Sequence, residues 1–171
     1  MPHLKSRSIK SVGIALMLLG GALLGPAVDS AIAQTSPTFA GLQGKWSGDG
    51  SIALTNGTTE RLRCDATYAI GGGGSNADLA LKCASDSYKF DLRVSLQDSD
   101  GAIVGQWSET NNNVQGGISG RGSRGLLQLT VRGQAFGAAV SVSTRGSEQS
   151  VRIHADSGNL SQVAITLHHA H

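Results

Sequence analysis

The sequence predicts an all-β domain in which about eight to ten short strands form an antiparallel up-and-down meander that closes into a small barrel. From Trp46 onward, apolar and polar residues alternate with a period of two, which is typical of strands with one buried face. Glycine, asparagine and aspartate cluster between these runs, where sequential hairpins would turn. A β-sandwich is the alternative that the same pattern allows.

The clearest hairpin lies between the two cysteines, Cys64 and Cys83. Its arms, residues 64–70 and 77–83, flank a glycine-rich turn at residues 71–76. Folding the arms about this turn sets Cys64 opposite Cys83 and pairs apolar residues at the other inner positions: Ile70 with Ala77, Tyr68 with Leu79, and Ala66 with Leu81. Directly opposed cysteines lie close enough for a disulfide, and closing a loop of this length contributes roughly 3 kcal/mol.

Residues 1–33 have the features of a secretory signal peptide. Lys5, Arg7 and Lys10 precede a short apolar run, and residues 31–33 form an A-x-A cleavage site. The run, residues 12–24, is shorter than the ~20 residues that a membrane span requires. We therefore expect a periplasmic or secreted protein without a membrane span, with a signal peptide at 1–33, a polar leader at 34–43 and one barrel domain at 44–171.

Removal of the signal peptide leaves a chain with balanced charge. The full sequence has 14 Lys and Arg and 12 Asp and Glu; the signal holds three of the basic residues and one acidic residue, so 11 of each remain. A neutral domain without a basic stripe is a poor nucleic-acid binder. We therefore expect no nucleic-acid partner.

Alternation also predicts how the first hairpin pairs. The first strand is expected at residues 45–55. A two-residue turn at 56–57 would pair an inner residue, Ile52, with an outer one, Arg61, so we expect a three-residue loop at 56–58. That loop sets inner residues opposite one another: Ile52 with Leu62, Gly50 with Cys64, and Trp46 with Tyr68.

The same rule predicts the later pairs, which are Leu92 with Trp107, Val140 with Val151, Ala138 with Ile153, and Val151 with Ile165. Residues 114–125 are the least regular stretch and are expected to hold a short strand within a loop, and residues 39–43 one turn of helix. Four glycines within strands suit the tight bends that barrel closure needs: Gly48, Gly50, Gly105 and Gly117.

Catalytic signals are sparse. His154 alternates with Ile153 and Ala155, which points it to solvent rather than into a pocket. Both cysteines are expected to be oxidised, so neither is a free nucleophile. Residues 120–125 match GxGxxG, but a strand rather than a helix is expected to follow, which argues against a nucleotide site. These observations predict a protein that is not an enzyme, without catalytic residues and without a cofactor.

No metal site is predicted either. The C-terminal His168, His169 and His171 are ligand types for transition metals, but a frayed tail with adventitious affinity is the commoner explanation. Residues 98–101, Asp-Ser-Asp-Gly, match part of a calcium loop, yet the later ligands are missing and a hairpin turn explains them better.

Six aromatic residues fall on expected inner faces: Trp46, Tyr68, Tyr88, Phe90, Trp107 and Phe136. In a small barrel such residues either line a cavity for an apolar ligand or fill the core. Filling is the commoner outcome, and the sequence leaves both open. This set is the candidate ligand cavity.

Gly44-Lys45-Trp46 resembles the G-x-W motif of the calycins, a group of ligand-binding and inhibitory β-barrels. Residues 42–46 also resemble the opening of the Inh-type bacterial metalloprotease inhibitors, which are exported barrels with one disulfide between early strands. The second resemblance implies that a segment before the first strand, here residues 34–40, enters a protease cleft.

The whole pattern is similar to a set of small exported alphaproteobacterial barrels, through residues 44–48, 60–64 and 83–88. That resemblance carries no mechanism with it. We therefore expect a non-enzymatic periplasmic binding or envelope-associated barrel, whose partner is a small apolar ligand or an envelope protein. A periplasmic protease inhibitor acting through its leader is the alternative.

Overall fold

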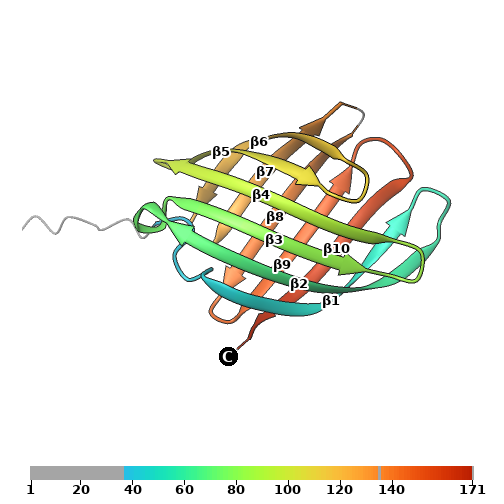
Figure 1. The fold of residues 1–171 in the computed structure, drawn as a ribbon, viewed down its shortest axis with the longest axis horizontal. Coiled ribbons are helices and arrows are strands. Elements are labelled where there is room, and N and C mark those ends of the chain that lie inside the picture. The colour runs from blue at the N-terminus through green and yellow to red at the C-terminus, as the bar shows by residue number, and fades with distance from the viewer. Residues whose placement is uncertain (1–36, 135, 171) are drawn as a thin grey trace, which may run out of the picture. The chain divides into compact units, whose positions relative to one another are not determined.

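The structure is a computed structural model that describes residues 37–134 and 136–170. In this part of the chain, ten antiparallel strands follow one another in sequence order, and β1 pairs with β10 to close the sheet into a barrel (Figure 1). The predicted all-β meander, its closure and its single disulfide are confirmed, and the sandwich alternative is excluded. The predicted signal peptide and residues 34–36 of the leader lie outside the described residues.

The strands are β1 (Gly44–Leu54), β2 (Thr59–Gly71), β3 (Asn76–Ala84), β4 (Lys89–Ser99), β5 (Ala102–Glu109), β6 (Val114–Ser123), β7 (Leu126–Gly133), β8 (Gly137–Arg145), β9 (Glu148–Ala155) and β10 (Leu160–His169). A short 3-10 turn, η1 (Gly72–Gly74), joins β2 to β3. Figure 1 shows β2–β4 crossing in front of β7–β10. Among the described residues, no helix has the length and apolar character needed to cross a membrane.

The β2–β3 hairpin forms in the register that the sequence predicts. Cys64 pairs with Cys83 and Tyr68 with Leu79, as do the other two predicted pairs. The two cysteines form the disulfide, and both are buried on the inner face. The alternation of apolar and polar residues was sufficient to predict this pairing, because both arms run without a bulge up to the glycine turn.

Other predicted registers are wrong by two residues while keeping the correct face. Ile52 lies opposite Glu60, Gly50 opposite Leu62, Gly48 opposite Cys64, and Trp46 opposite Ala66. The reason is the length of the connection: the last β1–β2 pair is Ala53 with Thr59, and beyond it the Leu54 amide donates to the Thr58 carbonyl at 2.8 Å and Asn56 Oδ1 accepts from the Thr58 amide at 2.9 Å. A shift of two leaves every side chain on its expected face.

Two later hairpins differ in the same way. Trp107 lies opposite Val94, and Leu92 lies opposite Glu109, because β4 and β5 are joined by the two residues Asp100 and Gly101. Val140 lies opposite Ile153, Ala138 opposite Ala155, and Val142 opposite Val151, again around a two-residue turn. The predicted pair of Val151 with Ile165 is confirmed.

The structure corrects two expectations about irregular segments. Residues 114–123 form the regular strand β6 rather than a short strand within a loop. The strand β7 follows the GxGxxG residues, as expected. Residues 39–43 form no helix: the Ala40 and Leu42 amides donate to the Pro37 and Phe39 carbonyls in successive turns.

Strand glycines let neighbouring backbones approach closely. A Cβ on Gly105 would lie 2.2 Å from the Ser95 carbonyl oxygen, and one on Gly48 would lie 2.0 Å from that of Thr166. Gly117 was predicted to act in this way and does not, since a Cβ there meets nothing within 4 Å. Its neighbour Gly116 does, because a Cβ there would lie 1.8 Å from the Arg132 carbonyl oxygen.

The segment before β1 closes one end of the barrel. The Phe39 amide donates to the Gly74 carbonyl, the Gly125 amide donates to the Thr38 carbonyl, and the Trp46 indole donates to the Leu42 carbonyl at 2.9 Å. Phe39 and Leu42 are almost completely buried. The β2–β3 and β6–β7 turns therefore hold this segment as a plug, which we define as residues 37–43.

We expect the double variant Cys64→Ala, Cys83→Ala to be less stable than the wild type by about 2–5 kcal/mol, because the open chain gains conformational freedom when unfolded. Urea unfolding of the oxidised wild type and the variant measures the difference. Two reactive thiols in the denatured, unreduced wild type would contradict the disulfide itself.

We expect Gly105→Ala to reduce the free energy of unfolding by about 1–3 kcal/mol, since the added methyl group would meet the β4 backbone and the Leu96 side chain. Gly117→Ala is the matched control, because its methyl group enters open space. Equal stability of the two variants in urea unfolding would show that Gly105 is not needed for close approach.

Candidate functional site: an internal cavity

The barrel encloses a cavity of about 720 Å³. Phe39 and Leu42 of the plug lie at its closed end. Its walls are mainly aliphatic, with Leu81, Leu92, Val131, Val140, Val151 and Ile165 among the lining residues. The inner faces of the alternating strands therefore form a continuous apolar surface around an open space.

The predicted aromatic set divides between lining this cavity and filling the barrel. Tyr68, Phe90, Trp107 and Phe136 line the cavity, and the Trp107 and Phe136 rings lie 6.0 Å apart in an edge-to-face contact. Trp46 packs edge-on against Tyr68 and His169 near the plug. Tyr88 stacks on Phe90, with ring centroids 6.1 Å apart, and is not among the lining residues.

The cavity exists because small residues occupy many inner positions of a wide barrel. Ala66, Ala77 and Ala138 are buried on inner faces, and Gly48 and Gly105 carry no side chain at all. Eight strands already give an interior wide enough for one small ligand, and the diameter grows with strand number. Ten strands with small inner residues leave more space than the six aromatics can fill.

A chain of hydrogen bonds places polar groups in the wall of the cavity. The Tyr68 hydroxyl donates to Gln149 Oε1 at 2.8 Å, and Gln149 Nε2 donates to Thr144 Oγ1 at 3.0 Å. Gln149 has no exposed surface. Burial raises the pKa of Tyr68 to about 12, despite the opposing effect of its hydrogen bond to Gln149, so the hydroxyl stays protonated at neutral pH.

The β5–β6 and β7–β8 turns, at the end of the barrel opposite the plug, contribute exposed residues to the cavity lining, so we place its opening there. Exposed polar residues of these turns, Asn112, Asn113 and Gln134, are also lining residues, as are Val114 and Phe136. We call this opening the mouth. It presents polar groups to solvent, whereas the walls below it are apolar.

Glu109 lies just inside the mouth and is 4% exposed. Its carboxylate accepts hydrogen bonds from the backbone amides of Asp91, Asn111 and Asn112, at 3.1, 3.0 and 2.6 Å. Burial acts to raise the pKa of Glu109, but these hydrogen bonds outweigh it and hold the pKa below its usual value. Glu109 therefore organises the β5–β6 turn as an ionised group.

Sequence reasoning missed Glu109 and Gln149 as lining residues. Both are on inner faces by the alternation: Glu109 follows Ile103, Gly105 and Trp107 at steps of two, and Gln149 precedes Val151 and Ile153. The sequence signal that could have found them was therefore an acidic residue and an amide residue at inner positions of the alternation. Two of their hydrogen-bond partners, Asp91 and Tyr68, were not foreseeable, because they lie on other strands 18 and 81 residues away.

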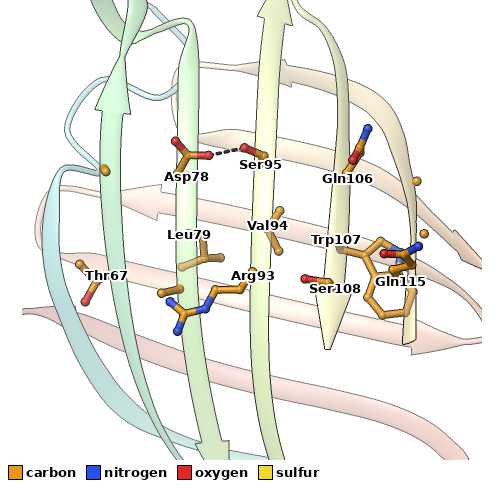
Figure 2. A pocket seen from close by; sticks show the side chains of 14 residues that line it. Thr67, Asp78, Leu79, Arg93, Val94, Ser95, Gln106, Trp107, Ser108 and Gln115 are labelled. Carbon is orange, nitrogen blue, oxygen red and sulfur yellow. Dashed lines mark hydrogen bonds between the residues drawn. The ribbon is translucent and has the colours of Figure 1, made fainter. Parts of the chain in front are cut away.

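A second hollow lies on the outer face of β2–β6 (Figure 2). Figure 2 shows its side chains, among them Thr67, Arg93 and Gln106, and the hydrogen bond that Ser95 donates to Asp78. The Arg93 side chain is 57% exposed and lies 3.7 Å from the Asp91 carboxylate. This hollow exposes less apolar surface than the internal cavity does, so the internal cavity is the better candidate site.

Among residues 37–134 and 136–170, no group of three or more His, Cys, Asp or Glu is arranged to hold a metal ion. His154 and His168 are exposed. The expected frayed tail is wrong at His169, which ends β10, packs against Trp46 and has Nε2 3.0 Å from the Gln43 carbonyl oxygen. His171 lies outside the described residues.

The fold is thus a closed antiparallel barrel with a plugged end and an open mouth. The structure of Rv2717c from M. tuberculosis is similar, with a TM-score of 0.60 and 13% sequence identity over 77% of this chain and 94% of that one. The S-type phycobiliprotein lyase CPES from Guillardia theta is also similar, with a TM-score of 0.52 and 12% identity over 78% of this chain and 90% of that one. At these identities the similarity shows the fold alone.

No protein-family model matches the sequence, and no curated protein matches it. The calycin-like fold implied by the G-x-W motif is supported by the two similar structures. The resemblances to Inh-type inhibitors and to exported alphaproteobacterial barrels stay predictions.

The prediction that this protein is not an enzyme is wrong, because it excluded catalysis for this fold. One protein with this fold is a phycobiliprotein lyase, so the barrel is compatible with catalysis. The prediction relied on missing sequence motifs, whereas in a barrel the inner residues of distant strands converge without any fixed spacing.

We expect tyrosinate absorbance in the variant Tyr88→Phe to have a midpoint near pH 12, because Tyr68 is then the remaining tyrosine and its neutral form is favoured by burial. The unfolded chain loses this proton at lower pH than the folded chain does. The free energy of unfolding therefore falls as the pH rises from about 10 to 12. Tyr68→Phe should lack this high-pH step. A midpoint near pH 10 in the folded Tyr88→Phe variant would contradict the burial of the hydroxyl.

Proposed function

We propose that this protein is an exported barrel that binds a small apolar ligand in its internal cavity. The observation that carries the proposal is the cavity itself, which has a volume of about 720 Å³ and predominantly aliphatic and aromatic walls. Ligand pockets in proteins have volumes of roughly 300–1,000 Å³ and the same apolar character. Among the described residues, the plug covers one end of the cavity and the mouth offers a route of entry at the other.

The arrangement of the walls supports this function. Phe90, Trp107 and Phe136 supply apolar surface from three separate strands or turns around the space below the mouth. Transfer of apolar ligand surface from water to such walls contributes roughly 25 cal/mol for each Å² buried. The polar residues of the mouth keep its rim hydrated, so burial of apolar ligand surface in the interior is the driving force for binding.

Export to the periplasm is part of the proposal. The disulfide between Cys64 and Cys83 fits an oxidising compartment, where such bonds persist. The predicted signal peptide at residues 1–33 supports the same location. A ligand carrier in this compartment would protect an apolar molecule from water.

The alternative of a protease inhibitor receives less support. Its leader mechanism needs residues 34–40 to enter a protease cleft, but Thr38 and Phe39 are buried in the plug. Releasing Phe39 would expose an aromatic side chain and open the closed end of the barrel. For an envelope-protein partner, no described contact or patch identifies a binding surface.

We expect the double variant Val131→Trp, Val140→Trp to bind an apolar fluorescent probe, N-phenyl-1-naphthylamine, at least about tenfold more weakly than the wild type, because both indoles occupy cavity space. The matched control is Thr130→Trp, Ala139→Trp, whose positions are exposed on the outer faces of the same strands. Probe fluorescence at increasing protein concentration gives the dissociation constants.

Circular dichroism establishes that each variant keeps the all-β fold, and the milder Val131→Phe serves if the double variant does not. Unchanged probe affinity in a folded, cavity-filled variant would contradict binding inside the barrel. Failure of the wild type to bind this probe, together with no co-purified apolar molecule in mass spectrometry of the native protein, would contradict the proposed function.

A further inference from the structure

The charge of the cavity lining restricts the chemistry of the ligand. Among the described residues that line the cavity there is no Lys, Arg or His. The lining has one carboxylate, that of Glu109, and the remaining polar side chains belong to tyrosine, asparagine and glutamine. The described lining therefore offers no cation to neutralise an acidic ligand.

Glu109 makes the mouth unfavourable for anions. Its carboxylate accepts three backbone amide hydrogen bonds and one from the Asn112 side chain at 2.8 Å, all of which favour the ionised form. An anionic ligand passing into the cavity would approach this charge in surroundings that screen it less than water does. Entry and burial of a second negative charge are both disfavoured.

The deeper polar groups do not compensate. Tyr68, Gln149 and Thr144 are joined in their own hydrogen-bond chain, in which the Tyr68 hydroxyl proton and Gln149 Oε1 are already used. Burying a charged group without a paired counter-charge costs much more than burying a neutral polar one. The wall can thus tolerate a neutral polar group but cannot hold a carboxylate.

We propose that the ligand is a neutral apolar molecule and that the barrel rejects amphiphiles with a carboxylate, such as ionised fatty acids. This inference rests on the proposed function, since it concerns the same cavity. The cavity would then distinguish neutral apolar molecules from carboxylates of similar apolar surface by the negative charge at one end of the carboxylate. The mouth Glu109 and the absence of a lining cation together make that selection.

Two ligands with the same chain, hexadecanol and hexadecanoate, test the inference by displacing N-phenyl-1-naphthylamine from the wild type. At about pH 8 we expect the alcohol to displace the probe and the carboxylate to be at least about tenfold weaker. At about pH 4, where much of the fatty acid is neutral, the difference should shrink, provided that circular dichroism shows the folded barrel.

The variant Glu109→Gln should reduce the difference in affinity between the two ligands at pH 8, because it strengthens the binding of hexadecanoate more than that of hexadecanol. Glu148→Gln, at an exposed position at the start of β9, is the matched control and should leave the ratio unchanged. If Glu109→Gln does not fold, the pH comparison on the wild type decides the question alone.

The possible results distinguish this inference from the proposed function. Hexadecanoate binding as tightly as hexadecanol at pH 8 would overturn the inference and leave an apolar-ligand barrel in place. Probe binding that hexadecanol cannot displace would also overturn it, because a neutral chain would then be refused. If neither the probe nor the alcohol binds, the proposed function itself fails.

Discussion

The hydrogen-bonded pairing of β1 with β10 is the constraint on which the rest of the structure depends. It turns an open meander into a ring without free edges, with the pairs running from Trp46 and His169 to Leu54 and Leu160. The ring requires strands to bend sharply, and Gly48, Gly105 and Gly116 allow this because a Cβ would meet a neighbouring carbonyl. Closure then fixes the enclosed volume, which the inner side chains either fill or leave open.

The two buried polar residues of the interior illustrate how an apolar cavity is kept in shape. Glu109 and Gln149 would each be costly to bury alone. Glu109 is satisfied by amides of the β5–β6 turn and of β4, and Gln149 by Tyr68 and Thr144. Each therefore links separate elements: Glu109 links β4 to the β5–β6 turn at one side of the mouth, and Gln149 links β9 to β2 in the barrel interior.

Contacts within the structure also explain the residues that carry the family resemblances. The tryptophan of the G-x-W motif, Trp46, holds the plug through its indole hydrogen bond to Leu42. Glu60, in the second motif segment, accepts hydrogen bonds from the Ser85 hydroxyl at 2.7 Å and the Ser87 amide at 3.1 Å, in the third. These residues therefore fasten the plug and the β3–β4 turn.

Outside β6, the sequence by itself determined which face the strand residues take, because a period of two is a local property of extended chain. It placed Cys64 opposite Cys83 and the six aromatics on inner-facing positions. Turn lengths shifted three registers by two residues, since loop hydrogen bonds such as that of Asn56 are set by the folded loop. Only the tertiary structure decided whether the interior is hollow, because that depends on the balance between ten-strand closure and the summed volume of residues from every strand.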